Sequence, residues 1–195
     1  MPGADTVAME SVANLTGHLL IAMPSMLDPN FERTVTYICE HSDQGALGII
    51  VNQPLDMDIG EVLQQLDLTA VDPAVASTPI IRGGPVELQR GFVIHQSPKR
   101  WDSTVAVADN IFVTTSQDIL GAIAKGNGPE RSLLALGYAG WGAGQLEEEL
   151  SANAWLSVAA DPAILFSTPF EERWRRAAQL LGIDIATLSS EAGHA

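Results

Sequence analysis

Short apolar runs recur along this chain of 195 residues, and most of them end at glycine, proline or a polar turn. Runs of roughly four to eight such residues are typical of buried strands. Thr34–Cys39 and Ala46–Val51 are separated by a polar turn and predict a hairpin. In chain order, strands are predicted at residues 18–23, 34–39, 46–51, 79–82, 91–95, 104–107, 111–114, 132–136 and 154–158. A β-sheet is therefore the main constraint on the fold.

Helix signals alternate with part of this strand series. Asp58 and Glu61 have the spacing of a capping box, and Thr168, Pro169 and Glu171 combine a cap, a first-turn proline and an acid. Helices are predicted at residues 58–66, 115–124, 145–150, 168–181 and 186–190, whereas 67–78 reads as a loop. Strands that partly form hairpins and partly alternate with helices predict an α/β fold, a compact mixed β-sheet sandwich with helices on both faces.

The chain is predicted to hold one domain. Residues 1–14 lack periodicity and predict a flexible tail, so the domain covers 15–195. There is no internal repeat, no apolar run of membrane-spanning length and no basic-plus-apolar signal at the N-terminus. We therefore expect a cytoplasmic protein.

The charge balance bears on partners. There are 24 acidic and 10 basic residues, which gives a net charge of −14 and repels nucleic acids and anionic membranes. Basic residues gather around Arg82–Arg100 and Arg173–Arg176, where neighbouring acids can balance them. We expect no membrane partner, and direct binding to nucleic acid, although disfavoured, stays open to a test of salt dependence.

The glycine-rich segment Gly137–Gly144 lies between a predicted strand and a predicted helix, where backbone amides could hold a phosphate. It lacks the spacing of known phosphate loops, and Glu147–Glu149 in the next helical turn would repel an anion. We therefore interpret the segment as a tight structural turn, with a binding loop that exposes Trp141 and Gln145 as the alternative.

No catalytic or metal-binding motif is present. The single Cys39 excludes an internal disulfide and a multi-cysteine zinc site, and the histidines lack metal-ligand spacing. No metal and no cofactor are predicted. His95 ends a strand in a locally basic segment, so we expect it to titrate near neutral pH.

Six sequence blocks in fixed order resemble the YqgE/AlgH family of bacterial proteins. They are GHLLIAMPSMLDPNFERTV, GALGIIVNQP, RGGPVELQRGFVIH, TSQDIL, GYAGWGAGQLEEEL and NAWL, and they span Gly17–Trp155. The later ADPAILF is also similar. The resemblance implies an α/β sandwich of unusual topology in a bacterial cytoplasmic protein. It supplies no catalytic residues and carries a suggestion of transcriptional regulation.

The matching blocks end in loops, and loops at strand ends are where α/β proteins usually assemble their sites. We therefore predict one shared surface that binds a protein or a small ligand. Its predicted residues are Met26, Asp28, Phe31, Asn52, Gly84, Pro85, His95, Trp141 and Gln145.

Two functions follow from this surface. The first is a non-enzymatic regulatory or adaptor domain. The alternative is a hydrolase or phosphotransferase that acts on a phosphorylated or nucleic-acid substrate through His95, Asp28 and Glu147.

Overall fold

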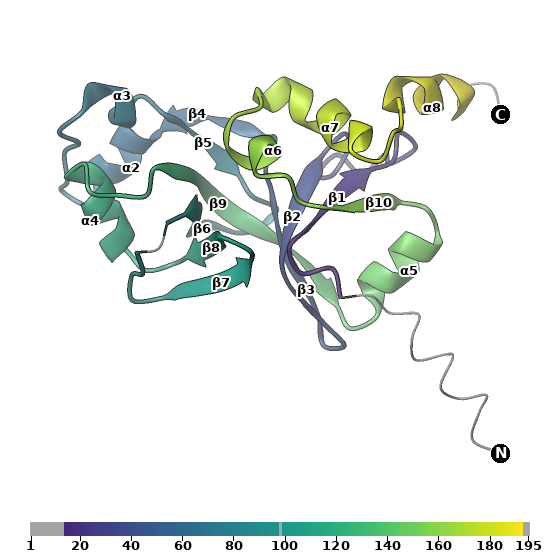
Figure 1. The fold of residues 1–195 in the computed structure, drawn as a ribbon, viewed down its shortest axis with the longest axis horizontal. Coiled ribbons are helices and arrows are strands. Elements are labelled where there is room, and N and C mark those ends of the chain that lie inside the picture. Colours follow the sequence, from purple (N-terminus) through teal and green to yellow (C-terminus); the bar gives the residue numbers. More distant parts are fainter. Residues whose placement is uncertain (1–13, 98, 193–195) are drawn as a thin grey trace, which may run out of the picture.

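A long central strand joins the two halves of the molecule. The computed structural model describes residues 14–97 and 99–192, and strand β9 (Arg131–Gly142) runs through its centre (Figure 1). The first part of β9 pairs with β6 (Val86–Gln96) and β5 (Pro79–Arg82), and its last part pairs with β3 (Gly45–Ile50). One strand therefore belongs to both halves of the sheet.

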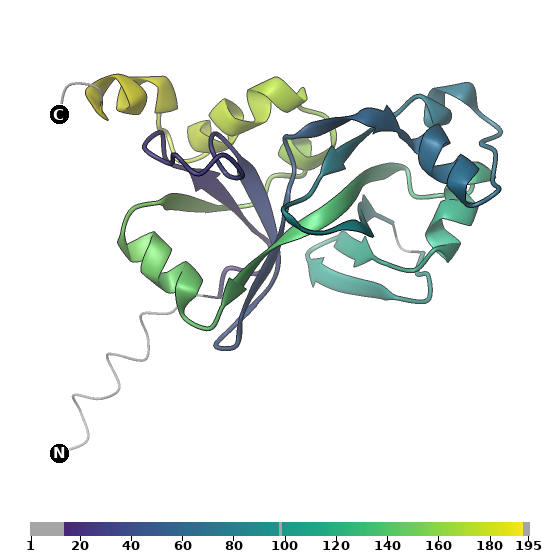
Figure 2. The same cartoon turned by 180° about the vertical axis from the view of Figure 1, so that it is seen from behind.

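The described residues form one ten-stranded sheet in the order β10-β1-β2-β3-β9-β6-β8-β7, with β4 and β5 attached beside β9. Every pairing is antiparallel except that of β5 with β9. The other strands are β1 (His18–Ala22), β2 (Val35–Ser42), β4 (Pro54–Asp58), β7 (Thr104–Ala108), β8 (Ile111–Thr114) and β10 (Trp155–Ala159). The sheet is strongly curled (Figures 1 and 2).

Seven helices of the described residues cover the sheet. They are α2 (Ile59–Gln65), α3 (Pro73–Ala76), α4 (Asp118–Ala124), α5 (Gln145–Ser151), α6 (Pro162–Phe166), α7 (Phe170–Gln179) and α8 (Ile185–Ala192). Figure 1 shows α2, α3 and α4 at one end of the molecule and α5 at the other. We call these ends the α4 half and the α5 half.

Alternation along the strands sends side chains into separate cores. In β1, Leu19 and Ile21 pack in a core that includes α6, α7 and α8, whereas Leu20 and Ala22 pack in a core that includes α5. A third core lies under α2 and α4. The predicted mixed sheet with helices on both faces is confirmed.

Two segments differ from the prediction. Residues 137–142 continue β9 instead of turning, and burial alternates there, with Ala139 and Trp141 inside and Gly140 outside. Similarly, β6 begins at Val86, not Gly91, because Val86 pairs with Tyr138 of β9; a bulge at residues 87–90 separates this pair from the one at Gly91. Short helices α3 and α6 were not predicted. The predicted capping box of α2 is confirmed, since Asp58 accepts a hydrogen bond from the Glu61 amide at 3.0 Å.

Of the predicted tail 1–14, only Asn14 lies among the described residues, and its side-chain oxygen accepts a hydrogen bond from the Thr16 amide at 2.9 Å. None of the described helices is long and apolar enough to cross a membrane. No group of three or more metal-ligating side chains occurs in residues 14–97 and 99–192.

Candidate functional site

Three aromatic rings meet in the α5 half. Trp141 comes from the end of β9, Trp155 begins β10, and Phe31 lies in the loop between β1 and β2. The ring centroids of Phe31 and Trp155 are 5.6 Å apart, and those of the two tryptophans are 6.1 Å apart, both in edge-on arrangements that favour aromatic pairs. Met26 packs against the same core. We call Phe31, Trp141 and Trp155 the aromatic corner.

The Glu149 carboxylate binds this corner to helix α5. Its Oε1 accepts hydrogen bonds from the indole nitrogens of Trp141 at 3.1 Å and Trp155 at 2.9 Å. Its Oε2 accepts from Gln145 Nε2 at 2.9 Å, and Gln145 Oε1 in turn accepts from the Gly142 amide at 3.0 Å. The carboxylate is thus the acceptor for two buried donors that would otherwise lack a partner.

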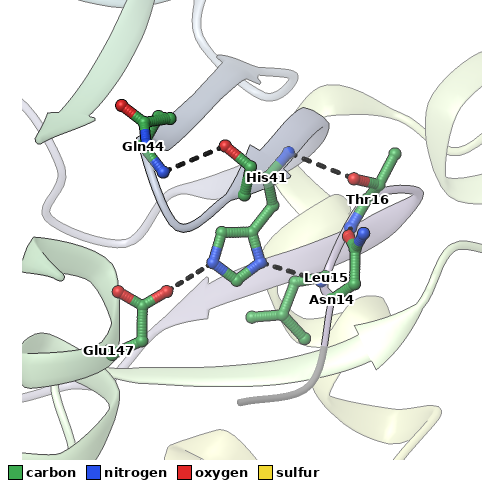
Figure 3. Close-up of polar contacts among 7 residues, drawn as sticks. Asn14, Leu15, Thr16, His41, Gln44 and Glu147 are labelled. Carbon is green, nitrogen blue, oxygen red and sulfur yellow. Dashed lines mark hydrogen bonds and ion pairs between the residues drawn. The ribbon is translucent and has the colours of Figure 1, made fainter. Parts of the chain in front are cut away.

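A buried histidine fixes the other side of α5 (Figure 3). The His41 Nδ1 accepts a hydrogen bond from the Leu15 amide at 2.9 Å, so its Nε2 carries the proton and donates to Glu147 at 2.5 Å. This hydrogen bond lowers the pKa of Glu147 below its ordinary value. His41 therefore links strand β2 to α5 and to the segment that precedes β1.

The loop Pro24–Phe31 is fixed at both ends. Before Leu27, the Met26 amide donates to the Met23 carbonyl at 2.9 Å. After it, the Asp28 carbonyl accepts from the Phe31 amide at 2.9 Å, and Asp28 Oδ1 accepts from the Asn30 amide at 2.9 Å. Phe31 anchors the loop in the aromatic corner. Between these fixed points, the side chain of Leu27 is 83 % exposed. The loop thus presents an apolar side chain on an ordered backbone.

The structure brings together four of the predicted site residues: Met26, Phe31, Trp141 and Gln145. Asp28 lies in the same loop, and Asn52 holds the chain just after the loop, donating to the Arg33 carbonyl at 2.9 Å. Trp141, however, is buried, so the prediction that it is exposed to a partner is wrong; the aromatic corner supports the surface from below.

Gly84 and Pro85 do not belong to this loop, and Gly84 has a packing role. Gly84 is buried where the chain between β5 and β6 crosses β9, and a Cβ atom there would overlap the backbone of Tyr138. The neighbouring Gly83 amide donates to Leu136 at 2.8 Å. These residues therefore position β6 against β9.

His95 is remote from the surface. It is 0 % exposed, and its Nε2 lies 2.7 Å from Thr114 Oγ1, with Phe112 stacked on the ring. Burial lowers the pKa of His95 to about 4, because desolvation disfavours the charged form. The expectation that it titrates near neutral pH is wrong.

The structure does not bring the proposed catalytic residues together. His95 pairs with Ser132 at the start of β9, whereas α5, which carries Glu147, follows the end of β9 at Gly142. Ten residues of strand span about 30 Å. Glu147 is instead bonded to His41, and the Asp28 carboxylate accepts a hydrogen bond within its own loop.

Sequence reasoning missed three residues that hold the α5 half together: His41, Glu149 and Trp155. Glu149 follows Gln145 by four positions, a spacing that places both on one face of a helix. That spacing is the one local signal in the sequence that indicates a contact of Glu149. The convergence of Trp141 and Trp155 on Glu149 depends on the pairing of β1 with β10, which no local pattern specifies.

Comparison with known proteins confirms the resemblance. The AlgH-like family model matches residues 19–186. A UPF0301 protein from Nitrosospira multiformis is 56% identical over 187 residues, 96% of this chain and 100% of the relative. One from Thiobacillus denitrificans is 54% identical with the same coverage.

Solved structures agree. The solution structure of the AlgH protein from Pseudomonas aeruginosa has a TM-score of 0.77 at 53% identity and covers 95% of this chain and 98% of its own. A crystal structure of a Corynebacterium diphtheriae protein shares the fold at 23% identity, with a TM-score of 0.72 and coverage of 97% and 99%. On these matches of sequence and structure, the chain belongs to the AlgH-like family.

Proposed function

We propose that this protein is a non-enzymatic adaptor or regulatory domain that binds another protein through the loop Pro24–Phe31. One observation carries the proposal: Leu27 is 83 % exposed on a loop whose backbone is held in place. A single exposed leucine is ordinary on a protein surface. An apolar side chain on a fixed loop above a packed aromatic corner loses little conformational entropy when it enters a partner's pocket.

The polar groups around the aromatic corner and α5 favour a binding role over catalysis. Both ring nitrogens of His41, the Glu147 carboxylate and the Glu149 carboxylate take part in hydrogen bonds within the protein. A general base or nucleophile must reach a substrate atom, and these groups are engaged in holding the fold. The corner is therefore built as a support for a docking loop.

The charges around Leu27 indicate the kind of partner. Asp28 is exposed next to Leu27, Glu32 is exposed directly after the loop, and the whole chain carries a net charge of −14. Complementary charge speeds association and selects among partners. We therefore propose a partner with an apolar pocket for Leu27, surrounded by lysine or arginine side chains.

A regulatory role would act through such protein contacts. In the second arginine group, Arg173 is buried and donates to the Val51 carbonyl at 2.8 Å, so it is not available to a phosphate. In the first, Arg90 pairs with Glu87 at 3.3 Å. These contacts weaken the case for a basic DNA-binding face.

The test compares two exposed apolar residues. Leu27→Asp adds a charge to the proposed contact, and Val71→Asp makes the same kind of change at a 72 % exposed residue in the α4 half. We expect the wild type and Val71→Asp to recover the same partner protein from native extract, and Leu27→Asp to lose it. Recovery by the wild type should fall as the salt concentration rises. Equal recovery by all three proteins would refute the assignment of the loop.

A further inference from the structure

A separate groove of about 620 Å³ lies in the α4 half, between α2 and α4. Its floor is the sheet face formed by β6 and β9, with Val93, Leu134 and Leu136, and Val62 and Leu120 stand on its walls. The groove shares no lining residue with the loop Pro24–Phe31 or the aromatic corner. It is therefore a second candidate site, independent of the proposed docking loop.

None of the described residues that line the groove is charged. The polar side chains that line it are the amides of Gln65, Gln89 and Gln117 and the hydroxyls of Thr114, Thr115 and Ser116. The three hydroxyls also take part in hydrogen bonds within the protein. A charged ligand that left water here would meet no counter-charge, which costs free energy, and an anion would also be repelled by the net charge of −14. The lining thus suits an uncharged ligand.

The floor has an open position at Gly91. Side chains alternate along β6, so residue 91 faces the groove with Val93, while Phe92 packs in the core on the other face. A Cβ atom at Gly91 would meet only Leu136 Cδ2, at 4.0 Å, an ordinary contact. The missing side chain leaves room for a ligand on this part of the floor.

We propose that this groove binds a small uncharged amphiphile, with an apolar chain against Leu134 and Leu136 and an amide or hydroxyl head facing the glutamine and hydroxyl wall. A volume of about 620 Å³ lies within the roughly 300–1,000 Å³ typical of small-molecule sites. Leu88, which is 53 % exposed, forms part of the entrance. The head group is held by neutral donors and acceptors alone.

The test uses Nile red, an uncharged fluorescent dye, as the reporter, and two competitors of equal length, decanamide and decanoate, at pH 8. We expect Nile red to bind the full chain and decanamide to displace it about tenfold better than the ionised decanoate. Gly91→Leu fills the floor and should weaken both Nile red and decanamide about tenfold or more. Gly121→Ala, in α4 and outside the lining, is the control and should bind like the wild type.

A second variant tests the charge argument even if Gly91→Leu fails to fold. Leu88→Lys places a cation at the exposed entrance and should improve displacement by decanoate about tenfold relative to decanamide. Equal displacement by the two competitors in the wild type, or no change with Leu88→Lys, would overturn the proposed ligand chemistry. Unchanged binding in folded Gly91→Leu would overturn the location.

Two other occupants would also contradict the proposal. Displacement of Nile red by a capped neutral peptide, acetyl-Leu-Val-Leu-Ala-amide, but not by decanamide would assign the groove to a peptide. Dimerisation of the wild type that Gly91→Leu abolishes in sedimentation equilibrium would assign it to a second copy of the chain. Both outcomes leave the Leu27 docking proposal unaffected, because that loop lies in the other half.

Discussion

At the scale of single residues, Glu149 connects most of the groups that hold the α5 half together. Its carboxylate accepts from two buried indoles and from Gln145, so one side chain ties β9, β10 and α5 to the same point. A buried donor that loses its acceptor costs more than an average hydrogen bond contributes. Glu149 should therefore matter for stability out of proportion to its size.

Replacing Glu149 with alanine should lower the free energy of unfolding by about 2 to 4 kcal/mol, because the indoles of Trp141 and Trp155 are left without partners. Urea unfolding followed by tryptophan fluorescence measures this change. Glu148→Ala, at the exposed neighbouring position, is the control and should cost no more than about 1 kcal/mol. Equal losses in the two variants would show that the Glu149 network is not structural.

His95 makes a pH prediction. Its pKa is about 4 in the folded protein and about 6.5 in an unfolded chain, so between these values the unfolded state binds the extra proton. Stability from the neutral, buried form is therefore present above pH 6.5 and lost as the pH falls towards 4. From pH 7 to 5, the free energy of unfolding should drop by about 2 kcal/mol more in the wild type than in His95→Gln. Identical pH profiles would contradict this assignment.

At the scale of elements, the crossing between the chain after β5 and strand β9 depends on glycine. Gly84 lies against the backbone of Tyr138, and Gly137 of β9 has a φ of 82°, a left-handed conformation, where a Cβ atom would lie 2.6 Å from the Gly84 carbonyl oxygen. The two glycines let the chain after β5 pass β9 before β6 pairs with it.

Gly84→Ala should lower the free energy of unfolding by about 3 kcal/mol or more, because the added methyl group overlaps backbone that cannot move aside. Gly140→Ala is the matched control in β9, where the new Cβ would contact Tyr138 Cε2 at 3.6 Å. The free energy of unfolding of this control, measured by thermal unfolding, should be unchanged or raised by up to about 1 kcal/mol. Tolerance of Gly84→Ala would show that the crossing can relax.

Local signals in the sequence predicted elements better than their lengths or their contacts. The β-branched run Thr34–Cys39 and the Asp58–Glu61 box were sufficient for a strand and for a helix start, because strand composition and capping act over a few residues. The glycines of 137–142 suggested a turn, but pairing with β3 extends the strand through them. The Glu149 contacts with Trp141 and Trp155 depend on tertiary structure and were not predictable.

At the scale of the whole molecule, β9 makes the two halves one structure. It pairs with β3 in the α5 half and with β5 and β6 in the α4 half, and the sheet continues from β10 to β7. The proposed docking loop lies in one half and the proposed ligand groove in the other. The sheet therefore keeps the two candidate sites apart. Because both halves share β9, the stability of each half depends on the other.

We expect the predicted domain, residues 15–195, to unfold in a single cooperative step, because neither half has a complete sheet without β9. Amide hydrogen exchange in increasing urea measures this directly. Amides of β1 and β2 should lose protection at the same midpoint as those of β6 and β8. Two midpoints, one for each half, would show that the halves are separate folding units.

Site-specific photo-crosslinking shows whether the loop Pro24–Phe31 is a docking surface for another protein. A photoreactive benzoylphenylalanine at position 27 and, as the control, at position 71 is irradiated in living cells that express the full chain. We expect a discrete protein adduct from position 27 that is absent from position 71 and is lost when Phe31→Ala removes the ring that anchors the loop. No adduct at position 27, or the same adduct from both positions, would contradict it.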